Sequence, residues 1–228
     1  HRKKSNGSTK TAYQYSWRKI HPNGKFEMTS DSIRDSTRYV VSDTHYGSIM
    51  PGNRMEMWRD VYLLRGADVH GGIWCGSLSV SGSGVNVSES VYCRGAASIS
   101  RGDKPAPKDS NVTFASCFTS PDSLVADPAD FKVRFLSDIY TGQLNISNTI
   151  VYGNIFANRV TIRDSIVLGG VFCTGTADIS NSLVSTFNVG NANLGENVSI
   201  FFPFAVAKEH INLSSSVRVL TFYSLHQS

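Results

Sequence analysis

Three short segments of the chain share one pattern, and this pattern constrains the fold more than any other feature. Each has a branched aliphatic residue, any residue, Gly, any residue, Ile or Val, an aromatic residue and a small residue. The segments are Val69–Cys75, Val151–Ala157 and Val167–Cys173, and the last two lie 16 residues apart. Because a unit of this length cannot bury its own apolar face, the repeat predicts a solenoid of stacked units.

Weaker copies extend the repeat in both directions. The segments 91–93 and 139–141 have the same column of aliphatic, aromatic and small residues, and the 48 residues between them fit two coils if inserted loops lengthen one. Between copies, apolar and polar residues alternate, as in Val160–Ile162, with Gly, Asn, Asp or Ser between the runs. This alternation is typical of short strands with one buried face, and three such strands fill a unit of 16 to 17 residues.

We therefore predict an all-β chain that forms a single-stranded, triangular, parallel β-helix. One inward ladder is expected to contain Ile73, Val91, Ile139, Ile155 and Val171. A second inward ladder, two positions further on, is expected to contain Cys75, Cys93, Thr141, Ala157 and Cys173. The aromatic residues between the ladders should point outward, and they are Trp74, Tyr92, Tyr140, Phe156 and Phe172. An exposed apolar stripe implies a cover, which is either residues 1–60 folded back over it or a partner molecule.

Charge and composition divide the chain into three parts. Lys and Arg outnumber Asp and Glu by 12 to 6 in residues 1–65, whereas the remainder holds 10 against 12. We expect a basic flexible tail at 1–10, a β-hairpin and cap segment at 11–60, and the β-helix at 61–228 with loop insertions around 100–110 and 119–131. The tail is either simply solvated or attracted to an anionic membrane surface. No nucleic-acid partner is expected.

The cysteines and the glycosylation triplets indicate different compartments. No Cys-x-x-Cys pair is present, and three of the four cysteines fall in one repeat column, which favours free thiols in a reducing, cytoplasmic compartment. Six Asn-x-Ser/Thr triplets instead support a secreted, glycosylated protein. These triplets begin at Asn6, Asn86, Asn111, Asn145, Asn197 and Asn212.

The sequence shows no catalytic constellation. It lacks a P-loop, a Gly-x-Gly-x-x-Gly fingerprint, a Gly-x-Ser-x-Gly elbow and a His-Glu-x-x-His helix. Two Asp-x-His pairs, 43/45 and 68/70, contain metal-ligand types, but histidine does not recur at the coil period. We expect no enzyme activity, no metal site and no cofactor. A hexapeptide-type acyltransferase is disfavoured, since neither a strict six-residue period nor a catalytic His is evident.

Over residues 66–220 the repeated anchor resembles the bactofilins, a family of polymer-forming cytoskeletal β-helix proteins. The resemblance lies in the Val-x-Gly-x-Ile/Val-x-small step and in the alternating segments Leu78–Val80 and Val160–Ile162 between its copies. It implies a right-handed β-helix that polymerises end to end without nucleotide, often beneath a membrane.

We accordingly expect a structural scaffold that self-associates, located in the cytoplasm or at a membrane. Large apolar residues near the C-terminus form the predicted self-association surface. They are Phe201, Phe202, Phe204, Val219 and Phe222. The alternative is a secreted or cell-surface adhesin or carbohydrate-binding module, in which the outward aromatic residues bind sugars.

Overall fold

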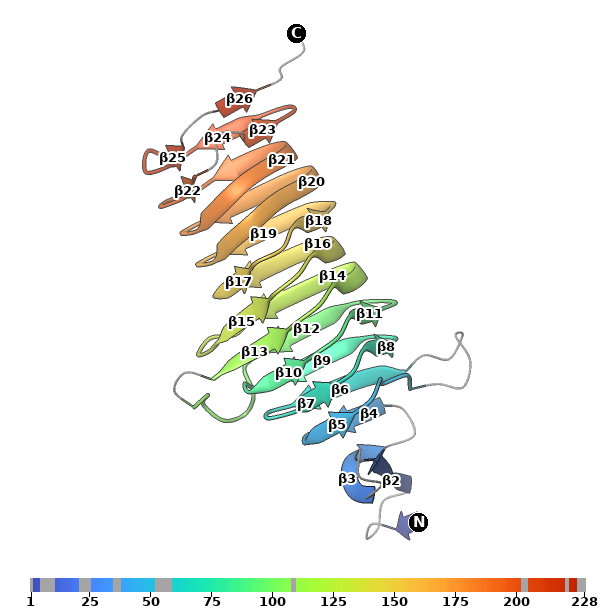
Figure 1. Cartoon of the computed structure of the whole chain (residues 1–228). Coiled ribbons are helices and arrows are strands. Elements are labelled where there is room, and N and C mark those ends of the chain that lie inside the picture. The colour runs from blue at the N-terminus through green and yellow to red at the C-terminus, as the bar shows by residue number, and fades with distance from the viewer. Residues whose placement is uncertain are drawn as a thin grey trace.

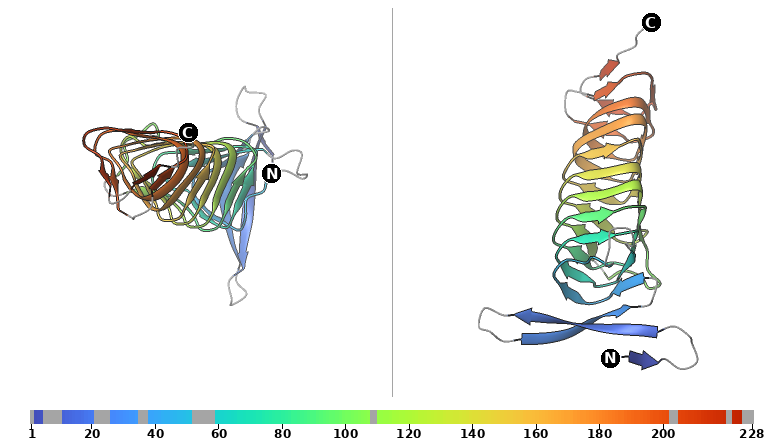
Figure 2. Two further views of the ribbon diagram at one scale, coloured as in Figure 1. Left: turned by 90° about the horizontal axis from the view of Figure 1, so that it is seen from above. Right: turned by 90° about the vertical axis from the view of Figure 1, so that its right-hand side faces the viewer.

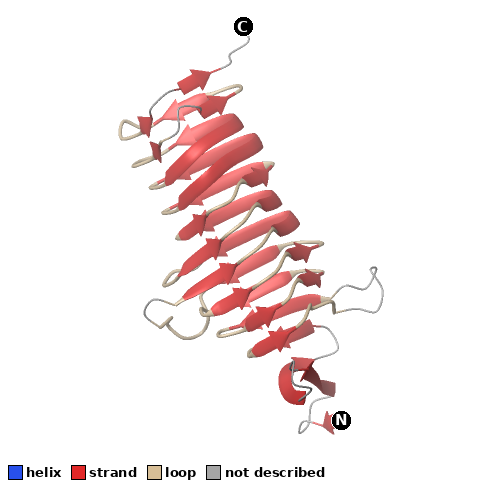
Figure 3. Ribbon diagram, viewed as in Figure 1, coloured by secondary structure: helices blue, strands red, loops and turns tan. Residues whose placement is uncertain are grey.

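The structure of the chain is a computed structural model that describes residues 2–4, 11–20, 26–34, 38–51, 59–107, 110–201, 205–219 and 222–224. These residues form an all-β parallel solenoid of about nine turns, which confirms the predicted fold class (Figures 1 and 3). Within the described ranges there is no helix, and hence none that could cross a lipid bilayer.

Each turn contributes one strand segment to each of three faces. The first face contains β4 (Arg38–Val41), β6 (Asp60–Leu64), β9 (Leu78–Ser81), β12 (Ala97–Ser100), the ends of β14 (Phe118–Asp127), β16 (Ile139–Ser147), β20 (Ile166–Ser180) and β21 (Leu183–Leu194), and also β19 (Arg159–Arg163) and β24 (Ile211–Leu213). The second face contains β5 (Thr44–Tyr46), β7 (Asp68–His70), β10 (Val85–Val87), β13 (Asn111–Phe114), β15 (Lys132–Phe135), β17 (Thr149–Val151), the starts of β20 and β21, β22 (Ser199–Ile200) and β25 (Arg218–Val219). The third face contains β8 (Ile73–Cys75), β11 (Val91–Cys93), the starts of β14 and β16, β18 (Ile155–Ala157), the middles of β20 and β21, β23 (Ala205–Ala207) and β26 (Phe222–Ser224).

Both predicted inward ladders are present on the third face. Ile155 pairs with Ile139 on one side and with Val171 on the other, and all ten residues assigned to the two ladders are buried. Phe118, which the repeat pattern did not assign, supplies the rung between Val91 and Ile139. Two coils therefore separate these residues, as the spacing predicts.

The two expected loop insertions have different outcomes. Residues 101–110 connect β12 to β13 and lengthen one coil, although 108 and 109 lie outside the described residues. The expected loop at 119–131 is wrong over most of its length, because β14 continues to residue 127. Its inward residues Leu124 and Ala126 are fully buried, and a register shift between Ser120 and Ser123 accommodates the intervening Pro-Asp pair.

An antiparallel sheet lies across the N-terminal end of the solenoid (Figure 2). β2 (Thr11–Ile20) pairs with β3 (Phe26–Arg34), and β3 pairs with β4 of the first turn. The expectation of a flexible tail does not hold for β1 (Arg2–Lys4), whose backbone pairs with β2. The β-helix was expected to begin at residue 61, but parallel strand pairing already begins at β4.

The corner between the first and second faces repeats one backbone conformation. Its residues have positive φ angles of 46 to 54°, a region that Asn and Asp tolerate better than other residues with a side chain. They are Asn148, Asp164, Asn181 and Asn197. Each of the first three is followed by a buried hydroxyl residue, and the Ser165 N–H donates to Ser182 Oγ at 3.1 Å. The recurring Asx-Ser/Thr-Ile/Leu-Val sequence is therefore a corner signature.

Candidate functional site: a groove beside stacked aromatic rings

The outward residues of the third face form a row along the solenoid axis. Tyr92, Tyr140 and Phe172 are 37%, 41% and 39% exposed, whereas Trp74 and Phe156 are partly buried. Thr119 separates the first two aromatic residues from the last three, because it occupies the same column between Tyr92 and Tyr140. The described strands β2 and β3 lie across the N-terminal end of the solenoid, and Ile49 bridges to Ile73 at the first rung of this face (Figure 2). Tyr92, Tyr140 and Phe172 stay more than a third exposed, so the expected cover by residues 1–60 does not extend over these three rings.

The last three rings of the row stack on one another. The ring centroids of Tyr140 and Phe156 are 4.9 Å apart with an interplanar angle of 8°, and those of Phe156 and Phe172 are 5.1 Å apart with an angle of 11°. Parallel rings at such spacings are offset, so each ring covers only part of its neighbour. The stack therefore joins three rungs and still leaves part of each ring at the surface.

Two glycines precede Phe172 and Trp74, whereas a single glycine, followed by Asn154, precedes Phe156. A Cβ atom at Gly169 would lie 2.1 Å from the carbonyl oxygen of Gly153, so the first glycine of the motif allows the rungs to approach closely. A Cβ atom at Gly170 would lie 2.8 Å from the ring of Phe172, and one at Gly72 would lie 2.4 Å from the ring of Trp74. The second glycine thus lets the ring lean over the strand that bears it.

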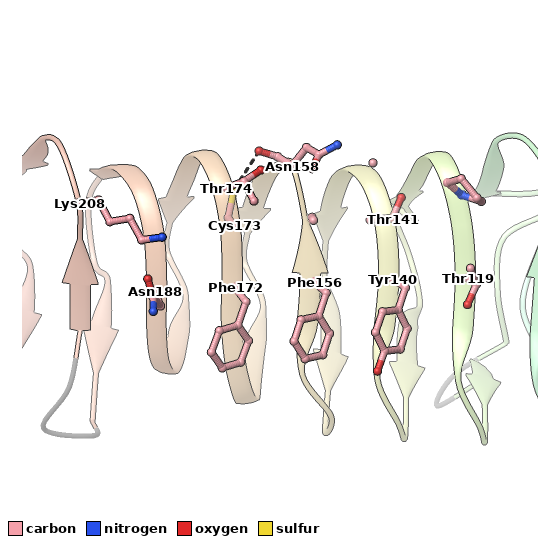
Figure 4. Close-up of a pocket in the computed structure, with 13 residues that line it drawn as sticks. Thr119, Tyr140, Thr141, Phe156, Asn158, Phe172, Cys173, Thr174, Asn188 and Lys208 are labelled. Carbon is pink, nitrogen blue, oxygen red and sulfur yellow. Dashed lines mark hydrogen bonds between the residues drawn. The ribbon is translucent and has the colours of Figure 1, made fainter.

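A groove of about 570 Å³ lies beside the leaning rings (Figure 4). In Figure 4 the small residues Thr141 and Cys173 lie between the rings and the opposite side of the groove. The groove is lined by Thr119, Pro121, Tyr140, Thr141, Gly142, Phe156, Ala157, Asn158, Phe172, Cys173, Thr174, Asn188 and Lys208. It therefore follows the solenoid axis over several rungs and combines an aromatic side with a polar side.

The polar side of the groove carries hydroxyl and amide groups. The Thr174 hydroxyl donates a hydrogen bond to Asn158 Oδ1 at 3.2 Å. In Figure 4 the Nδ2 of Asn158 points away from Thr174, and Lys208 extends toward Asn188. Among the described residues that line the groove, Lys208 is the one that carries a charge.

The thiol of Cys173 and the hydroxyl of Tyr140 stay protonated at neutral pH. Burial raises the pKa of the Cys173 thiol above its ordinary value. Desolvation, followed by the Asp138 carboxylate near its hydroxyl, raises the pKa of Tyr140. Both groups are therefore neutral hydrogen-bonding groups near neutral pH.

The predicted self-association residues lie at the C-terminal end. Phe201 is 37% exposed, while Phe202 and Phe204 lie outside the described residues. The backbone of Val219 pairs with that of Ile200, and the backbone of Phe222 pairs with that of Ala205. Both residues therefore belong to strands of the last rung, and their side chains lie outside the described part of the structure.

The two Asp-x-His pairs do not meet. His45 is fully buried and points into the solenoid, whereas His70 on the next rung points outward. His70 lies 3.1 Å from the Asp68 carboxylate and stacks on Tyr46 at a centroid distance of 5.1 Å. The described ranges contain no cluster of three or more His, Cys, Asp or Glu residues that could hold a metal ion.

The cysteines and the glycosylation triplets are also placed by the structure. All four cysteines are free; Cys117 is partly exposed and the other three are buried. Of the triplet asparagines, Asn86, Asn145, Asn197 and Asn212 are exposed, Asn111 is partly buried and Asn6 lies outside the described residues. Comparison of the chain with protein-family models, with curated proteins and with solved structures finds no match.

Proposed function

We propose that the protein is a structural β-solenoid scaffold that self-associates through its C-terminal end. The observation that supports this is the pairing of the last rung. Each of β24, β25 and β26 pairs with the preceding rung and, within the described residues, with no strand on its outer side. An open strand edge is a template for pairing with another chain.

The composition of this edge also supports association. Sheet edges of monomeric proteins are usually blunted by charged residues or Pro. β24 instead consists of Ile211, Asn212 and Leu213, and Leu213 is 52% exposed. This uncharged part of the edge, with its exposed aliphatic side chain, favours contact with a second copy, whereas β25 carries the exposed Arg218.

The opposite end of the solenoid differs. The outer edge of β4 is paired with β3 of the antiparallel sheet. Because this edge of the first turn is already occupied, the C-terminal edge is the better surface for growth. The arrangement favours a symmetric dimer in which two C-terminal rungs meet, rather than the open end-to-end polymer that the resemblance to bactofilins implies.

Sedimentation of the full chain and of a charged edge variant tests this function. Wild-type protein should sediment as a dimer or larger species, and Leu213→Lys should give monomers with unchanged circular dichroism and melting temperature. Leu168→Lys is the matched control, because Leu168 is also exposed, at 43%, but lies in the middle of the solenoid. Wild-type protein that is monomeric at high micromolar concentration and low salt would exclude the proposal.

A backbone variant separates pairing from side-chain contact. The Ser214 N–H donates to the Leu194 carbonyl, so the alternation of a parallel strand directs the Leu213 N–H outward. Leu213→Pro removes this outward donor without removing a hydrogen bond to β21. If backbone pairing drives association, this variant should also be monomeric and folded.

A secreted binding module is the second candidate, and the exposed triplet asparagines favour it. Asn86, Asn145, Asn197 and Asn212 are accessible to glycosylation in a secretory pathway. A loss of mass after glycosidase treatment of protein from its native source would support this function. An unchanged mass would support the intracellular scaffold.

A further inference from the structure

We propose that the groove on the third face binds an extended acidic polysaccharide. The rings beside the groove are regularly spaced. The centroids of Tyr140, Phe156 and Phe172 are 4.9 and 5.1 Å apart and follow the solenoid axis. This distance between neighbouring rings is similar to the length that one pyranose residue adds to an extended polysaccharide. A sugar chain lying along the groove would therefore bring successive residues to successive rings.

The chemistry of the two sides of the groove matches that of a pyranose. A sugar ring has an apolar C–H surface and a rim of hydroxyl groups. The offset aromatic rings offer apolar surface on one side, and Asn158 and Thr174 offer amide and hydroxyl groups on the other (Figure 4). The Thr174 hydroxyl and Asn158 Oδ1 already bond to each other, but an entirely apolar partner could not accept a hydrogen bond from Asn158 Nδ2, which points away from Thr174.

The backbone of the groove excludes recognition of a peptide by strand addition. The Asn158 N–H donates to the Gly142 carbonyl, and the Gly175 N–H donates to the Asn158 carbonyl, so these groups are already used between rungs. Strand addition requires a free sheet edge. The groove lies on a sheet face and crosses the strands, which suits a ligand recognised by side chains.

The charge of the groove indicates an acidic sugar. Lys208 is its one charged lining residue, and it extends toward Asn188 in the column of the rings (Figure 4). The Asp138 carboxylate lies outside the described lining, 3.4 Å from the Tyr140 hydroxyl. The Lys208 ammonium is therefore the group that can pair with a carboxylate of a bound ligand. A single cation gives little affinity for a polyphosphate chain, because such binding depends on many phosphate contacts.

Calorimetric titration of the full chain with two matched oligosaccharides tests the proposal. The probes are a β-1,4-linked hexamannuronate and the neutral hexamannoside of the same linkage. Hexamannuronate should bind in preference to the neutral probe, and Phe156→Ala should weaken its binding about tenfold or more, which corresponds to about 1.4 kcal/mol. Tyr92→Ala is the matched control, because Tyr92 lies in the same outward row but does not line the groove.

Two further variants keep the test independent of folding. Asn158→Ala changes the polar side without disturbing the ring stack and should also weaken binding. Lys208→Gln should remove the preference for the acidic probe and the dependence of binding on salt. Binding of neither probe, or hexamannuronate affinity that is unchanged in both Phe156→Ala and Asn158→Ala, would overturn the proposal. Equal affinity of wild-type protein for the two probes would overturn the assignment of an acidic ligand.

Discussion

The sulfur atoms of Cys75 and Cys93 lie 3.5 Å apart on adjacent rungs in the interior of the solenoid. Both side chains are fully buried. The hydrogen bond that the Cys75 thiol donates to Cys93, together with desolvation by burial, raises the pKa of Cys75 well above its ordinary value. The Cys75 thiol is therefore protonated near neutral pH, and both sulfur atoms are shielded from solvent.

This environment predicts a graded thiol reactivity. Cys117 is partly exposed and should react first with a small aromatic disulfide reagent in native protein, whereas Cys75, Cys93 and Cys173 should react slowly. Denatured protein should titrate four thiols. The release of the reagent's thiolate, followed by absorbance, measures both rates. Fewer than four thiols in denatured protein from its native source would indicate a disulfide and an oxidising compartment.

The same thiol predicts a loss of stability at alkaline pH. In the unfolded chain Cys75 titrates near the ordinary value of 9.0, whereas in the folded chain its pKa is raised. Its contribution to stability is therefore complete below about pH 9 and is lost as the pH rises toward the folded pKa, by about 1.4 kcal/mol per pH unit. Urea unfolding at neutral and alkaline pH should show a smaller loss for Cys75→Ala than for wild type. Equal slopes would exclude this linkage.

Ile155→Asp should unfold the stacked coils. Ile155 is fully buried between Ile139 and Val171, so an aspartate there is a buried charge without a partner and costs several kcal/mol. Circular dichroism and thermal melting measure the effect. Asn145→Asp is the control, because it introduces the same charge at an exposed position of the neighbouring rung and should leave the melting temperature nearly unchanged.

The inward ladders could be predicted from the sequence because the same buried column recurs in every rung. Ile155 and Val171 occupy equivalent places in an almost regular repeat, so their spacing alone assigns them to one ladder. Phe118 was not assigned for two reasons. Inserted residues precede its rung, and Thr119 replaces the aromatic residue that marks the others.

The groove could not be predicted in the same way. Alternation indicates that Phe172 points outward, but it does not indicate the direction in which the ring leans. That direction depends on the space above Gly170, and the polar side of the groove depends on the contact of Thr174 with Asn158 on the preceding rung. These are relations between rungs, and they appear only when the coils are stacked in register.

Substitution of Gly169, the first glycine of the repeat, should lower the stability of the fold more than substitution of a glycine outside the rung contacts. A Cβ atom at Gly169 would meet backbone atoms of Gly153 and Asn154, so Gly169→Ala must push two rungs apart and should cost about 1–3 kcal/mol. Gly95→Ala is the control, since its added Cβ would lie 3.3 Å from its nearest neighbours. Chemical denaturation of the two variants gives the comparison. A loss at Gly95 as large as that at Gly169 would contradict the role assigned to rung contact.

The backbone conformation of the repeated corner predicts the relative stability of variants at Asn181. This residue has a φ of 47°, and its Oδ1 accepts a hydrogen bond from Asn197 Nδ2 at 3.1 Å. Asn181→Ala loses that hydrogen bond and places a Cβ in the left-handed region, whereas Asn181→Gly loses the hydrogen bond without this strain. Wild type should therefore be the most stable and the alanine variant the least, with glycine about 1 kcal/mol above alanine. Urea denaturation measures the order, and Asn145→Ala, at an exposed extended position, controls for the loss of an asparagine side chain. An alanine variant as stable as the glycine variant would show that the backbone conformation at this corner does not limit stability.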